Sequence, residues 1–537
     1  MYSCLHFLVK MFLFLRKEKI DSFLIGMFAI SFAMASALWL GQDASWDLRN
    51  YHYYNPYAWL QNRANIDIAP AQLQSFFHPF ADLPHYLMVK AGYPSWVITC
   101  ILALPVALTL YFLGHLFQIA SSNSKTIYIV FPVLLMAGTG ASGFSVIGST
   151  MSEWHVTALF VAALWLSLKE NGSPSDNVSL QSGLLGGVAV GLKLTGAGYA
   201  VALGAMYLSM PGSPLQRIRQ TAWLGLGGLI GFTLAFAPWG IEMWERFQNP
   251  LFPFFNQWFK SPWAEFSSYA ATPYATQSVW ETLSLPWRLM WTSGPLVSEL
   301  RLQDWRLGLG FPALALLAFG PFHSDEKQQK FWLPLLVFCC VSYVIWARLY
   351  GIYRYAGLLE VLMPVAIVMA TVSIFKQRKM LAVSLATVTV LTPTVWPNWG
   401  RLPHGQAAVI AKMPKLPANA MVVFATLEPV GYLAPNLPPE IPVVSLINNF
   451  MHTDPGRIQL QKLATQKVLQ HQGPLWLLMQ QGFEAEKYYN GKPIAMMLDE
   501  IGLASQTQSC LPIQTNFTGT LMLCPLTIQR NKLSNPA

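Results

Sequence analysis

The sequence predicts an all-α polytopic membrane protein that ends in a small extracytoplasmic α/β domain. The 537-residue chain is 53% hydrophobic and only 11% charged, with a mean hydropathy of +0.38. A soluble domain usually carries about 25% charged residues. Long apolar segments fill residues 1–399, whereas residues 400–537 have the mixed composition of a soluble fold. We therefore expect a multispanning domain over 1–399 and a separate domain over 400–537.

Most apolar segments come close to the ~20 residues that a helix needs to cross a bilayer. The opening stretch MYSCLHFLVKMFLFLRKEK has no small-residue cleavage site before the first span. We interpret it as a cytoplasmic interfacial segment and not as a removed signal peptide. The predicted spans are residues 22–41, 94–119, 127–148, 153–169, 220–238, 308–322, 331–348, 356–374 and 380–396.

Residues 182–210 decide the number of spans. This segment is too long for one upright helix, and Lys193 lies near its centre. The Lys and Arg residues of the short loops all fall on the cytoplasmic side only if the segment crosses twice, as two short helices that meet near Lys193. We therefore predict about 11 spans, with the N-terminus cytoplasmic and the C-terminus outside. The alternative is one tilted helix and ten spans, which would place Arg217 and Arg219 outside.

This topology leaves the loops 42–93 and 239–307 outside, together with the tail. The formal charge of +9 gives no argument for nucleic acid, because basic residues gather in the short interhelical loops. The sequence contains no P-loop, dinucleotide fingerprint or zinc-ligand spacing. Transport driven by a nucleotide is therefore not indicated.

The tail has a pattern of its own. AMVVFATL, IPVVSLI, GPLWLLMQ and TGTLMLCPL predict short buried strands, and DPGRIQLQKLATQKVLQHQ and KPIAMMLDEIGL predict amphipathic helices. Cys510 and Cys524 flank a predicted hairpin with its turn at Asn516 to Gly519. A hairpin of this length could bring both cysteines to the ~5.5 Å Cα separation of a disulfide, which an oxidising compartment favours. Two free buried thiols are the alternative.

The first outer loop begins with the unusual stretch WDLRNYHYYNPYAWL, residues 46–60. Asp43, Asp47 and Tyr51 recur at four-residue spacing, so a helical turn would place them on one face. His78 and Asp82 follow in the same loop. The alternative is an interfacial loop in which acids face water and Tyr and Trp form the aromatic belt.

Other polar residues lie at the outer ends of predicted spans. Glu153 and His155 begin one span, Lys193 lies between the two short helices, and Arg354 follows a late span. Arg348, nearby, could be a snorkelling anchor only. Charges within a membrane are costly and usually functional. Acids and bases around an outward-facing cavity suit an anionic lipid-linked substrate and a base for an incoming hydroxyl.

Four segments in order resemble the GT-C superfamily of multispanning glycosyltransferases, which includes protein O-mannosyltransferases and lipid A aminoarabinose transferases. WDLRNYHYYNPYAWL resembles the family's first outer loop, and HPFADLPHYLMV the stretch before the second span. GLLGGVAVGLKLTGAGYA and YRYAGLLEVLMP resemble two later helices. The resemblance covers about residues 20–375 and excludes the tail. HPF stands where relatives often have two prolines.

The resemblance implies a transferase that moves a sugar from a polyprenyl-phosphate donor to a hydroxyl acceptor at the outer face of a bacterial inner membrane. Asp47 would be the general base, and Arg354 and Lys193 would bind the donor phosphate. The residues expected to support acceptor or sugar binding are Asp43, Tyr51, His78, Asp82, Glu153 and His155. Some relatives use a divalent metal, and Asp43, Asp47 and Glu153 are the carboxylates that could hold one.

Two other functions stay open. One is an O-antigen-type polymerase or ligase, and the other is a transporter or flippase for a lipid-linked sugar. A polymerase or ligase of that type would not depend on an acid directly after the first span. Asp47 therefore distinguishes it from a GT-C enzyme.

Overall fold

The computed structural model describes residues 2–121, 127–170, 173–270, 272–292, 294–321, 326–452, 458–480, 486–517 and 519–529. The chain divides into two compact units. The helical unit comprises Met1–Gly41, Thr99–Ala237 and Ala271–Trp399, and the sheet unit comprises Gln42–Ile98, Pro238–Ala270 and Gly400–Ala537. The sheet unit thus includes the whole first outer loop, although the sequence predicts this loop as part of the multispanning domain over 1–399.

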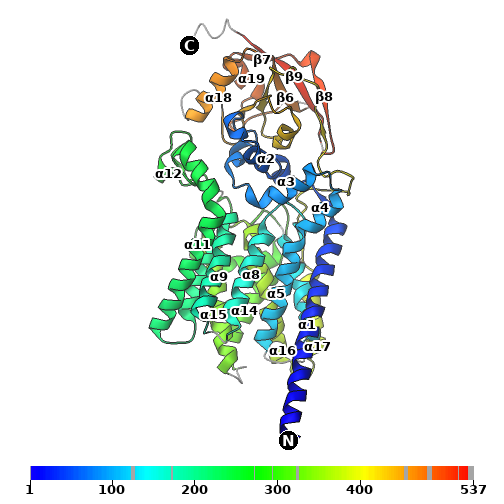
Figure 1. Ribbon diagram of the computed structural model, residues 1–537, viewed down its shortest axis with the longest axis vertical. Helices are drawn as coiled ribbons and strands as arrows, with labels where there is room; N and C mark the ends of the chain where they lie inside the picture. Colours follow the sequence, from blue (N-terminus) through cyan, green and yellow to red (C-terminus); the bar gives the residue numbers. More distant parts are fainter. Residues whose placement is uncertain are drawn as a thin grey trace. The chain divides into compact units, whose positions relative to one another are not determined.

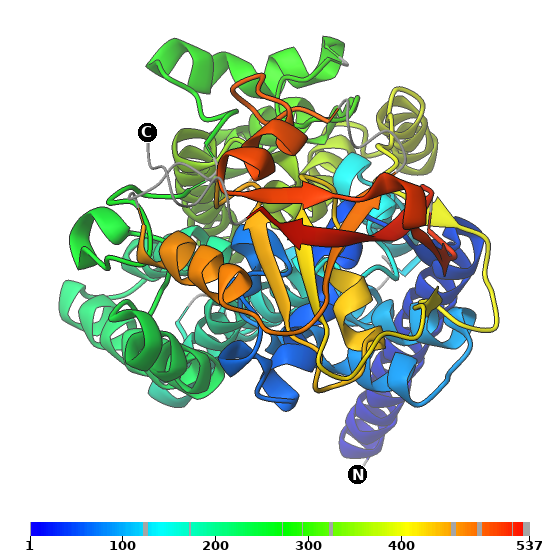
Figure 2. The ribbon, with the colours of Figure 1, turned by 90° about the horizontal axis from the view of Figure 1, so that it is seen from above.

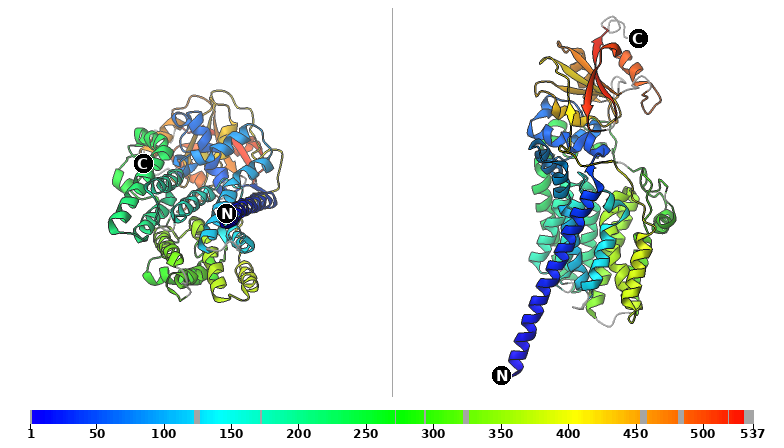
Figure 3. Two further views of the ribbon diagram at one scale, coloured as in Figure 1. Left: turned by 60° about the horizontal axis from the view of Figure 1, so that its bottom comes forward. Right: turned by 90° about the vertical axis from the view of Figure 1, so that its right-hand side faces the viewer.

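The helical unit is a bundle of helices that lie side by side (Figures 1 and 3), and α1 extends beyond the others at its N-terminal end (Figure 3, right). Its helices are α1 (Tyr2–Leu40), α5 (Leu104–Ser121), α6 (Ile127–Gly138), α7 (Ala141–Ser145), α8 (Glu153–Leu168), α9 (Asp176–Leu192), α10 (Ala197–Ser209), α13 (Val279–Trp291), α14 (Arg306–Phe319), α15 (Glu326–Leu349), α16 (Gly357–Ile374) and α17 (Lys379–Leu391). Two further helices, α4 (Ser95–Leu102) and α11 (Pro214–Phe247), continue from one unit into the other.

Within the described residues, five helical segments are long and apolar enough to cross a membrane: Lys19–Leu40, Ser95–Ser121, Pro214–Phe247, Lys330–Leu349 and Tyr353–Ile374. Shorter apolar helices cover Ile127–Gly138, Glu153–Leu168, Leu194–Ser209, Arg306–Phe319 and Lys379–Leu391. Each predicted span overlaps a helix. The chain is thus mostly helical and consistent with a polytopic membrane protein, and the number of 11 crossings stays a prediction.

The chain reverses direction at the expected break near Lys193. α9 ends just before Lys193, whose backbone is extended (φ −149°, ψ 108°), and α10 begins just after Gly196. Ser167 Oγ in α8 lies 3.0 Å from Ser182 Oγ in α9 and 2.9 Å from Tyr207 Oη in α10. Because Ser182 precedes the break and Tyr207 follows it by several turns, α9 and α10 run antiparallel. The expected pair of short helices is present.

Glycines let α9 pack against α11 with their backbones in contact. A Cβ atom on Gly183 would lie 2.0 Å from Leu224 O, and one on Gly187 would lie 2.1 Å from Gly228 O. No side chain fits at either position. Small residues at four-residue spacing are a common device for close packing of membrane helices, where the hydrophobic effect does not drive association. The glycines of the segment GLLGGVAVG therefore serve helix packing.

The sheet unit is built on a seven-stranded mixed sheet with the order β3-β8-β9-β6-β4-β5, and β7 also pairs with β9. Figure 2 shows this sheet from above. β4 pairs in parallel with β5 and β6, and the other pairs are antiparallel. The strands are β3 (Ala411–Lys412), β4 (Met421–Ala425), β5 (Val443–Ile447), β6 (Leu475–Gln480), β7 (Leu503–Ser505), β8 (Leu511–Thr515) and β9 (Leu521–Ile528).

The strands predicted from the tail coincide with β4, β5, β6 and β9, and the predicted helices with α18 (Gln459–Leu469) and α19 (Ile494–Glu500). Residues 454–457, at the start of the first predicted helix, lie outside the described residues. A separate two-stranded sheet joins β1 (Gln42–Asp43) to β2 (Arg401–Leu402). The remaining helical elements of this unit are η1 (Leu48–His52), α2 (Tyr54–Leu60), η2 (Arg63–Asn65), η3 (Gln72–Phe76), η4 (Phe80–Asp82), α3 (Leu83–Lys90), α12 (Asn256–Phe259), η7 (Gly431–Asn436) and η9 (Thr507–Ser509).

The tyrosines of the first outer loop form part of the core of the sheet unit. Tyr53, Tyr54 and Tyr57 are 7%, 3% and 6% exposed and belong to one buried cluster with residues of β4, β5 and η7. At Gly431 in η7, a Cβ atom would lie 2.0 Å from Asn50 O, so the two segments meet at backbone distance. An interfacial aromatic belt therefore does not account for these three rings. They hold the first outer loop onto the tail.

A buried ion pair also fixes this loop to β5. Arg63 Nη2 donates to Asp67 Oδ1 at 2.6 Å and to Ile441 O at 2.8 Å. Asp67 Oδ1 in turn accepts from Val443 N at 2.9 Å, and Ile68 N donates to Val443 O at 2.9 Å. Both charges are thus neutralised and hydrogen-bonded, as burial of charge requires.

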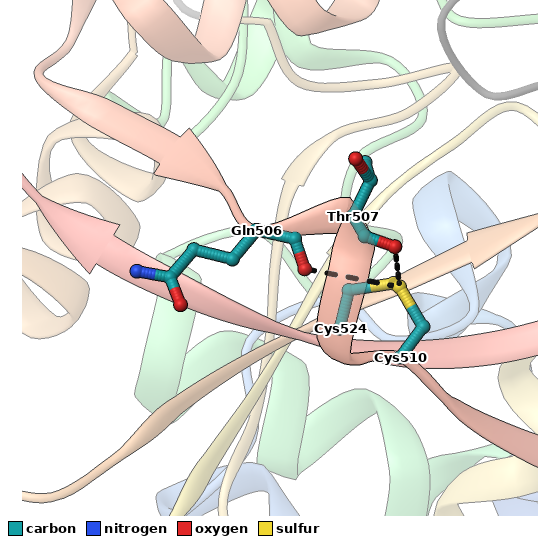
Figure 4. The surroundings of a disulfide bond; sticks show 4 residues. All are labelled: Gln506, Thr507, Cys510 and Cys524. Atoms are coloured by element: carbon teal, nitrogen blue, oxygen red, sulfur yellow. Dashed lines mark hydrogen bonds between the residues drawn. A yellow bond between two sulfur atoms is a disulfide. The ribbon is translucent and has the colours of Figure 1, made fainter.

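Cys510 and Cys524 are joined by a disulfide, the pair that the sequence analysis proposed (Figure 4). β8 and β9 form the expected hairpin, and the Cα atoms of the two cysteines are 4.1 Å apart. Cys510 Sγ lies 3.2 Å from Thr507 O.

We predict that two additional labels appear on the 510–524 peptide only after reduction, when thiols are blocked under denaturing conditions and the protein is then analysed by mass spectrometry. Cys339 and Cys340, which are free thiols, serve as the control and should be labelled without reduction. Opening the bond should lower the stability of the sheet unit by about 3 kcal/mol in the chain-entropy model. Full labelling of the 510–524 peptide without reduction would refute the bridge.

Candidate functional site

A small, half-open cavity lies between helix ends of the helical unit. Three of its lining residues are charged, and all three are candidates from the sequence: Glu153, Lys193 and Arg354. The other lining residues are Val156, Thr157, Thr195, Gly196, Tyr199, Tyr355, Gly357 and Leu358.

Three separate segments bring the charges together. Glu153 is the first residue of α8, Lys193 follows the last residue of α9, and Arg354 lies in the short helix η6 (Tyr353–Ala356) that precedes α16. Lys193 Nζ lies 2.8 Å from Glu153 Oε1, and Arg354 Nη1 lies 3.8 Å from the same oxygen. The break after α9 directs the Lys193 side chain into the cavity. If the helix continued through this residue, the chain would run past the cavity.

Glu153, Lys193 and Arg354 form an ion triplet in which one hydrogen-bond acceptor remains unsatisfied within the described part of the chain. Glu153 is only 8% exposed, and its second oxygen, Oε2, is buried and has no hydrogen-bond partner among the residues that the structure describes. The side chains of Lys193 and Arg354 are 22% and 15% exposed, so both remain accessible from the cavity. Two cations around one carboxylate leave a formal charge of +1. An anion entering the cavity would meet a positively charged site with charged N–H donors.

Aromatic rings hold the two cations in place. Lys193 Nζ lies 5.4 Å from the centre of the Tyr355 ring, and Arg354 Cζ lies 4.6 Å from the centre of the Trp399 ring. These are cation–π distances. Tyr199 Oη donates to Tyr355 O at 2.5 Å and thereby fixes the η6 turn to α10. His155, two residues along α8 from Glu153, is not among the residues that line the cavity.

A second buried charge cluster in the same unit looks different. Arg306 bonds to Asp304 at 2.7 Å and to Met136 O at 2.8 Å, and Asp304 accepts from Ala141 N at 2.8 Å. Glu360 accepts from two backbone amides in α7, at 3.0 and 2.8 Å. Arg306, Asp304 and Glu360 are 0% exposed. Both of the Glu360 oxygens are satisfied and none of the three side chains is reachable, so this cluster is structural.

The acids of the first outer loop lie in the sheet unit, and Asp43 is not where the spacing placed it. Asp43 belongs to β1, opposite Arg401 in β2, and its Oδ1 accepts from Ser45 N at 2.9 Å. The helical turn begins only at Trp46. The expectation that Asp43 shares a helical face with Asp47 and Tyr51 is therefore wrong, because pairing with the tail holds Asp43 in an extended backbone.

Sequence reasoning missed His52, which forms a buried pair with Asp82 of the same loop. His52 Nδ1 lies 2.7 Å from Asp82 Oδ1, and the two residues are 4% and 3% exposed. Burial lowers the pKa of His52, but the charge and hydrogen bond of Asp82, with the charges of Asp47 and Asp43, outweigh burial and raise the pKa overall. His85, also buried, has its pKa lowered to about 4, mainly by burial. No local pattern could reveal a pair that lies 30 residues apart.

Tyr51 and His78 lie in the same loop with less specific contacts. The Tyr51 ring packs 4.0 Å from the His52 ring and 5.3 Å from the Phe77 ring, centre to centre. His78 Nδ1 accepts from Phe80 N at 3.4 Å. Tyr51 thus covers His52, and His78 supports a local turn.

A metal site is not apparent in the described part of the chain, where no group of three or more His, Cys, Asp or Glu side chains has suitable geometry. Asp43 and Asp47 belong to the sheet unit and Glu153 to the helical unit. The metal ligand set considered from the sequence therefore stays a prediction without support from geometry.

We predict that the His52–Asp82 pair makes the stability of the protein depend on pH above about 6.5. A raised folded-state pKa means that the stabilisation is complete below the unfolded pKa of 6.5 and is lost as pH rises through the folded value. His85 does not obscure this window, because its depressed pKa confines its effect to lower pH. Asp82→Asn should lower the unfolding temperature most at pH 6 to 7 and flatten the decline toward pH 9.

Thermal unfolding across this pH range measures the effect. Asp176→Asn is a matched control, since Asp176 pairs with Arg219 at an exposed site of the helical unit and surface pairs contribute little. Parallel curves for wild type and Asp82→Asn would show that His52 is neutral in the folded protein.

No protein-family model and no curated protein matches this sequence. Among solved structures, the crystal structure of the oligosaccharyltransferase of Archaeoglobus fulgidus, in complex with Zn and sulfate, is similar to 89% of this chain and 69% of that chain. The two are 11% identical, and the TM-score is 0.47. A similarity of this degree does not assign the chain to a family.

Proposed function

We propose that this protein is a membrane glycosyltransferase of GT-C type, which transfers a sugar from a polyprenyl-phosphate donor to a hydroxyl acceptor. The observation that carries the proposal is the cavity in which Lys193 and Arg354 surround Glu153. The two cations come from the two late segments that resemble GT-C helices, GLLGGVAVGLKLTGAGYA and YRYAGLLEVLMP. The helical unit that contains the cavity is consistent with a membrane-spanning domain.

The cavity suits the phosphate of a lipid-linked sugar. A phosphodiester carries one negative charge, which matches the formal charge of +1 of the triplet. Arg354 can present two N–H groups to two phosphate oxygens, and Lys193 adds a point charge. Glu153 holds both cations in position before the donor arrives, so little reorganisation is needed when the phosphate binds. Val156 and Leu358 give the cavity apolar walls.

In the proposed reaction, Asp47 is the general base. Its carboxylate takes the proton of the acceptor hydroxyl as the hydroxyl oxygen attacks the anomeric carbon. The bond between the anomeric carbon and the donor phosphate oxygen breaks, and the lipid phosphate leaves with the electron pair. Arg354 and Lys193 stabilise the charge that develops on this phosphate. No general acid is required, because a phosphate is already a good leaving group.

The other candidates have supporting roles in this scheme. Asp43 and Asp82 position the turn that carries Asp47, the first through Ser45 and the second through His52. Tyr51 and His78 are proposed to contact acceptor or sugar. His155, the sixth candidate, is likewise proposed to support acceptor or sugar binding. We further propose 11 crossings of a bacterial inner membrane, with the N-terminus cytoplasmic and residues 400–537 outside.

We predict that Asp47→Asn lowers turnover by about 10² to 10⁴, because the amide keeps the size of the side chain and removes the base. The assay is transfer from labelled polyprenyl-phosphate sugars, tested as a panel, by the purified protein in lipid. Asp43→Asn is the matched control and should affect turnover less. If Asp43→Asn proves the more damaging change while Asp47→Asn stays near wild type, the base is Asp43.

We predict that Arg354→Lys raises the apparent KM for the donor, since lysine keeps the charge and loses the bidentate geometry. Arg354→Ala should be worse, with protein levels little changed. Arg348→Lys is the matched control, because Arg348 lies in the last turn of α15 and is exposed. Equal donor KM values for wild type and both Arg354 variants would mean that Arg354 only anchors the chain in the membrane.

A further inference from the structure

The short helix α13 has two apolar faces. One face, with Thr282, Leu285, Leu289 and Met290, is buried, and α13 contacts α14 and α15. The other face is not covered by any of the residues that the structure describes. Its large side chains are Trp280, Leu283, Trp287 and Trp291, which are 77%, 68%, 60% and 59% exposed. Spacings of three and four residues place these four side chains in one stripe along the helix.

The stripe does not suit water, and the helix does not suit a membrane crossing. A contiguous apolar surface of this kind marks an interaction site. α13 has 13 residues, so it is only about 20 Å long at 1.5 Å per residue, against the ~30 Å hydrocarbon core of a bilayer. Its N-terminus carries a polar capping box formed by Ser278 and Glu281. Arg288, also exposed, lies beside Trp287 and Trp291.

These properties match the surface of a bilayer. Tryptophan concentrates at the level of the lipid headgroups, where its ring is partly apolar and its N–H can reach water. Arg288 can meet lipid phosphates there. α13 packs on α14, a shorter apolar helix, and on α15, which is long and apolar enough to cross a membrane. α13 is therefore attached directly to a helix that can cross the bilayer.

The segments around α13 hold the turn that carries Arg354. Thr276 N donates to Ala347 O at 2.7 Å, and Tyr353 N donates to Val297 O at 2.8 Å. At Gly351, where φ is +65°, a Cβ atom would lie 1.9 Å from Tyr274 O. Residues 347–353 are thus held by residues 274–297 on both sides of α13. The depth of α13 in the membrane sets the depth of the residues directly before Arg354.

We propose that α13 is an interfacial helix that docks Trp280, Trp287 and Trp291 on the lipid bilayer surface and thereby holds the Arg354 turn at the level of the lipid phosphates. The docking itself follows from α13 alone. The further claim, that the Arg354 turn lies at this level in order to bind a donor phosphate, rests on the proposed function. The interaction partner is the lipid surface and not another protein.

Spin-label depth measurements test the docking without any assay of activity. The cysteines outside the disulfide, Cys4, Cys100, Cys339 and Cys340, are replaced by alanine, and the full chain is reconstituted in vesicles of phosphatidylethanolamine and phosphatidylglycerol. A label at Leu283→Cys is compared with one at Leu229→Cys, on the exposed face of α11, and one at Gln472→Cys, exposed in the sheet unit. Relaxation by oxygen and by a water-soluble nickel chelate reports the depth of each label.

The label at Leu283 should lie between the two references, near the headgroups. A value equal to that of Gln472 would place α13 in water, and a value equal to that of Leu229 would place it in the hydrocarbon core. Either result would overturn the docking. The proposed function would be untouched, because it depends on Arg354 and Asp47.

A triple variant tests the link to Arg354. Trp280→Ser, Trp287→Ser and Trp291→Ser together change only exposed side chains, so the buried face of α13 is kept. A label at Arg348→Cys should move toward water in this variant, and the donor KM should rise several-fold with kcat little changed. If the label at Arg348 does not move, the link is refuted. If the label moves in a protein with no transferase activity, the inference holds and the proposed function fails.

Discussion

The candidate site depends on one buried carboxylate. Glu153 lies where α8 begins, and without it Lys193 and Arg354 would be two like charges held close together within an apolar helical bundle. Loss of one partner from a buried ion pair typically costs about 3–5 kcal/mol, so charge neutralisation helps to hold together the three helix ends that contribute these residues. The same carboxylate also determines what the site offers to a ligand. It leaves a net positive charge, an oxygen with no hydrogen-bond partner among the described residues, and two accessible cations beside a cavity.

Other buried charges show what a purely structural solution looks like. Asp304, Arg306 and Glu360 use backbone groups of α6 and α7 as partners and are fully enclosed. Arg63 and Asp67 likewise use the backbone of β5 and of its preceding segment. In both clusters the polar groups face backbone and not a cavity. The contrast with Glu153 separates charges that organise the fold from charges that are available to a ligand, and residue type alone does not make this distinction.

The first outer loop has two roles that its sequence does not separate. Its tyrosines belong to the core of the sheet unit, while Asp47 stays half-buried at the start of the helical turn. The His52–Asp82 pair, on which the Tyr51 ring packs, holds two parts of the loop together. A rigid core directly beside an acid would fix its orientation, which is what a general base requires. The proposed role of Asp47 thus explains why aromatic residues surround it in the sequence: they build the core that orients it.

Local patterns determined much of this protein in advance. Hydropathy located the helices, charge bias and a central lysine located the break between α9 and α10, and alternating apolar runs located β4, β5, β6 and β9. These features depend on neighbours in the chain, so the sequence expresses them directly.

The tertiary structure decided which distant segments meet. In the structure, Asp43 lies in a strand opposite Arg401 and not on a helical face, and His52 pairs with Asp82. Three tyrosines of the first outer loop lie in the core of the sheet unit. The tertiary structure also gathered Glu153, Lys193 and Arg354 around one cavity, as their positions at span ends suggested but could not establish. The reason is physical: burial and charge compensation act through space, and partners that are tens or hundreds of residues apart leave no periodic signal in the chain.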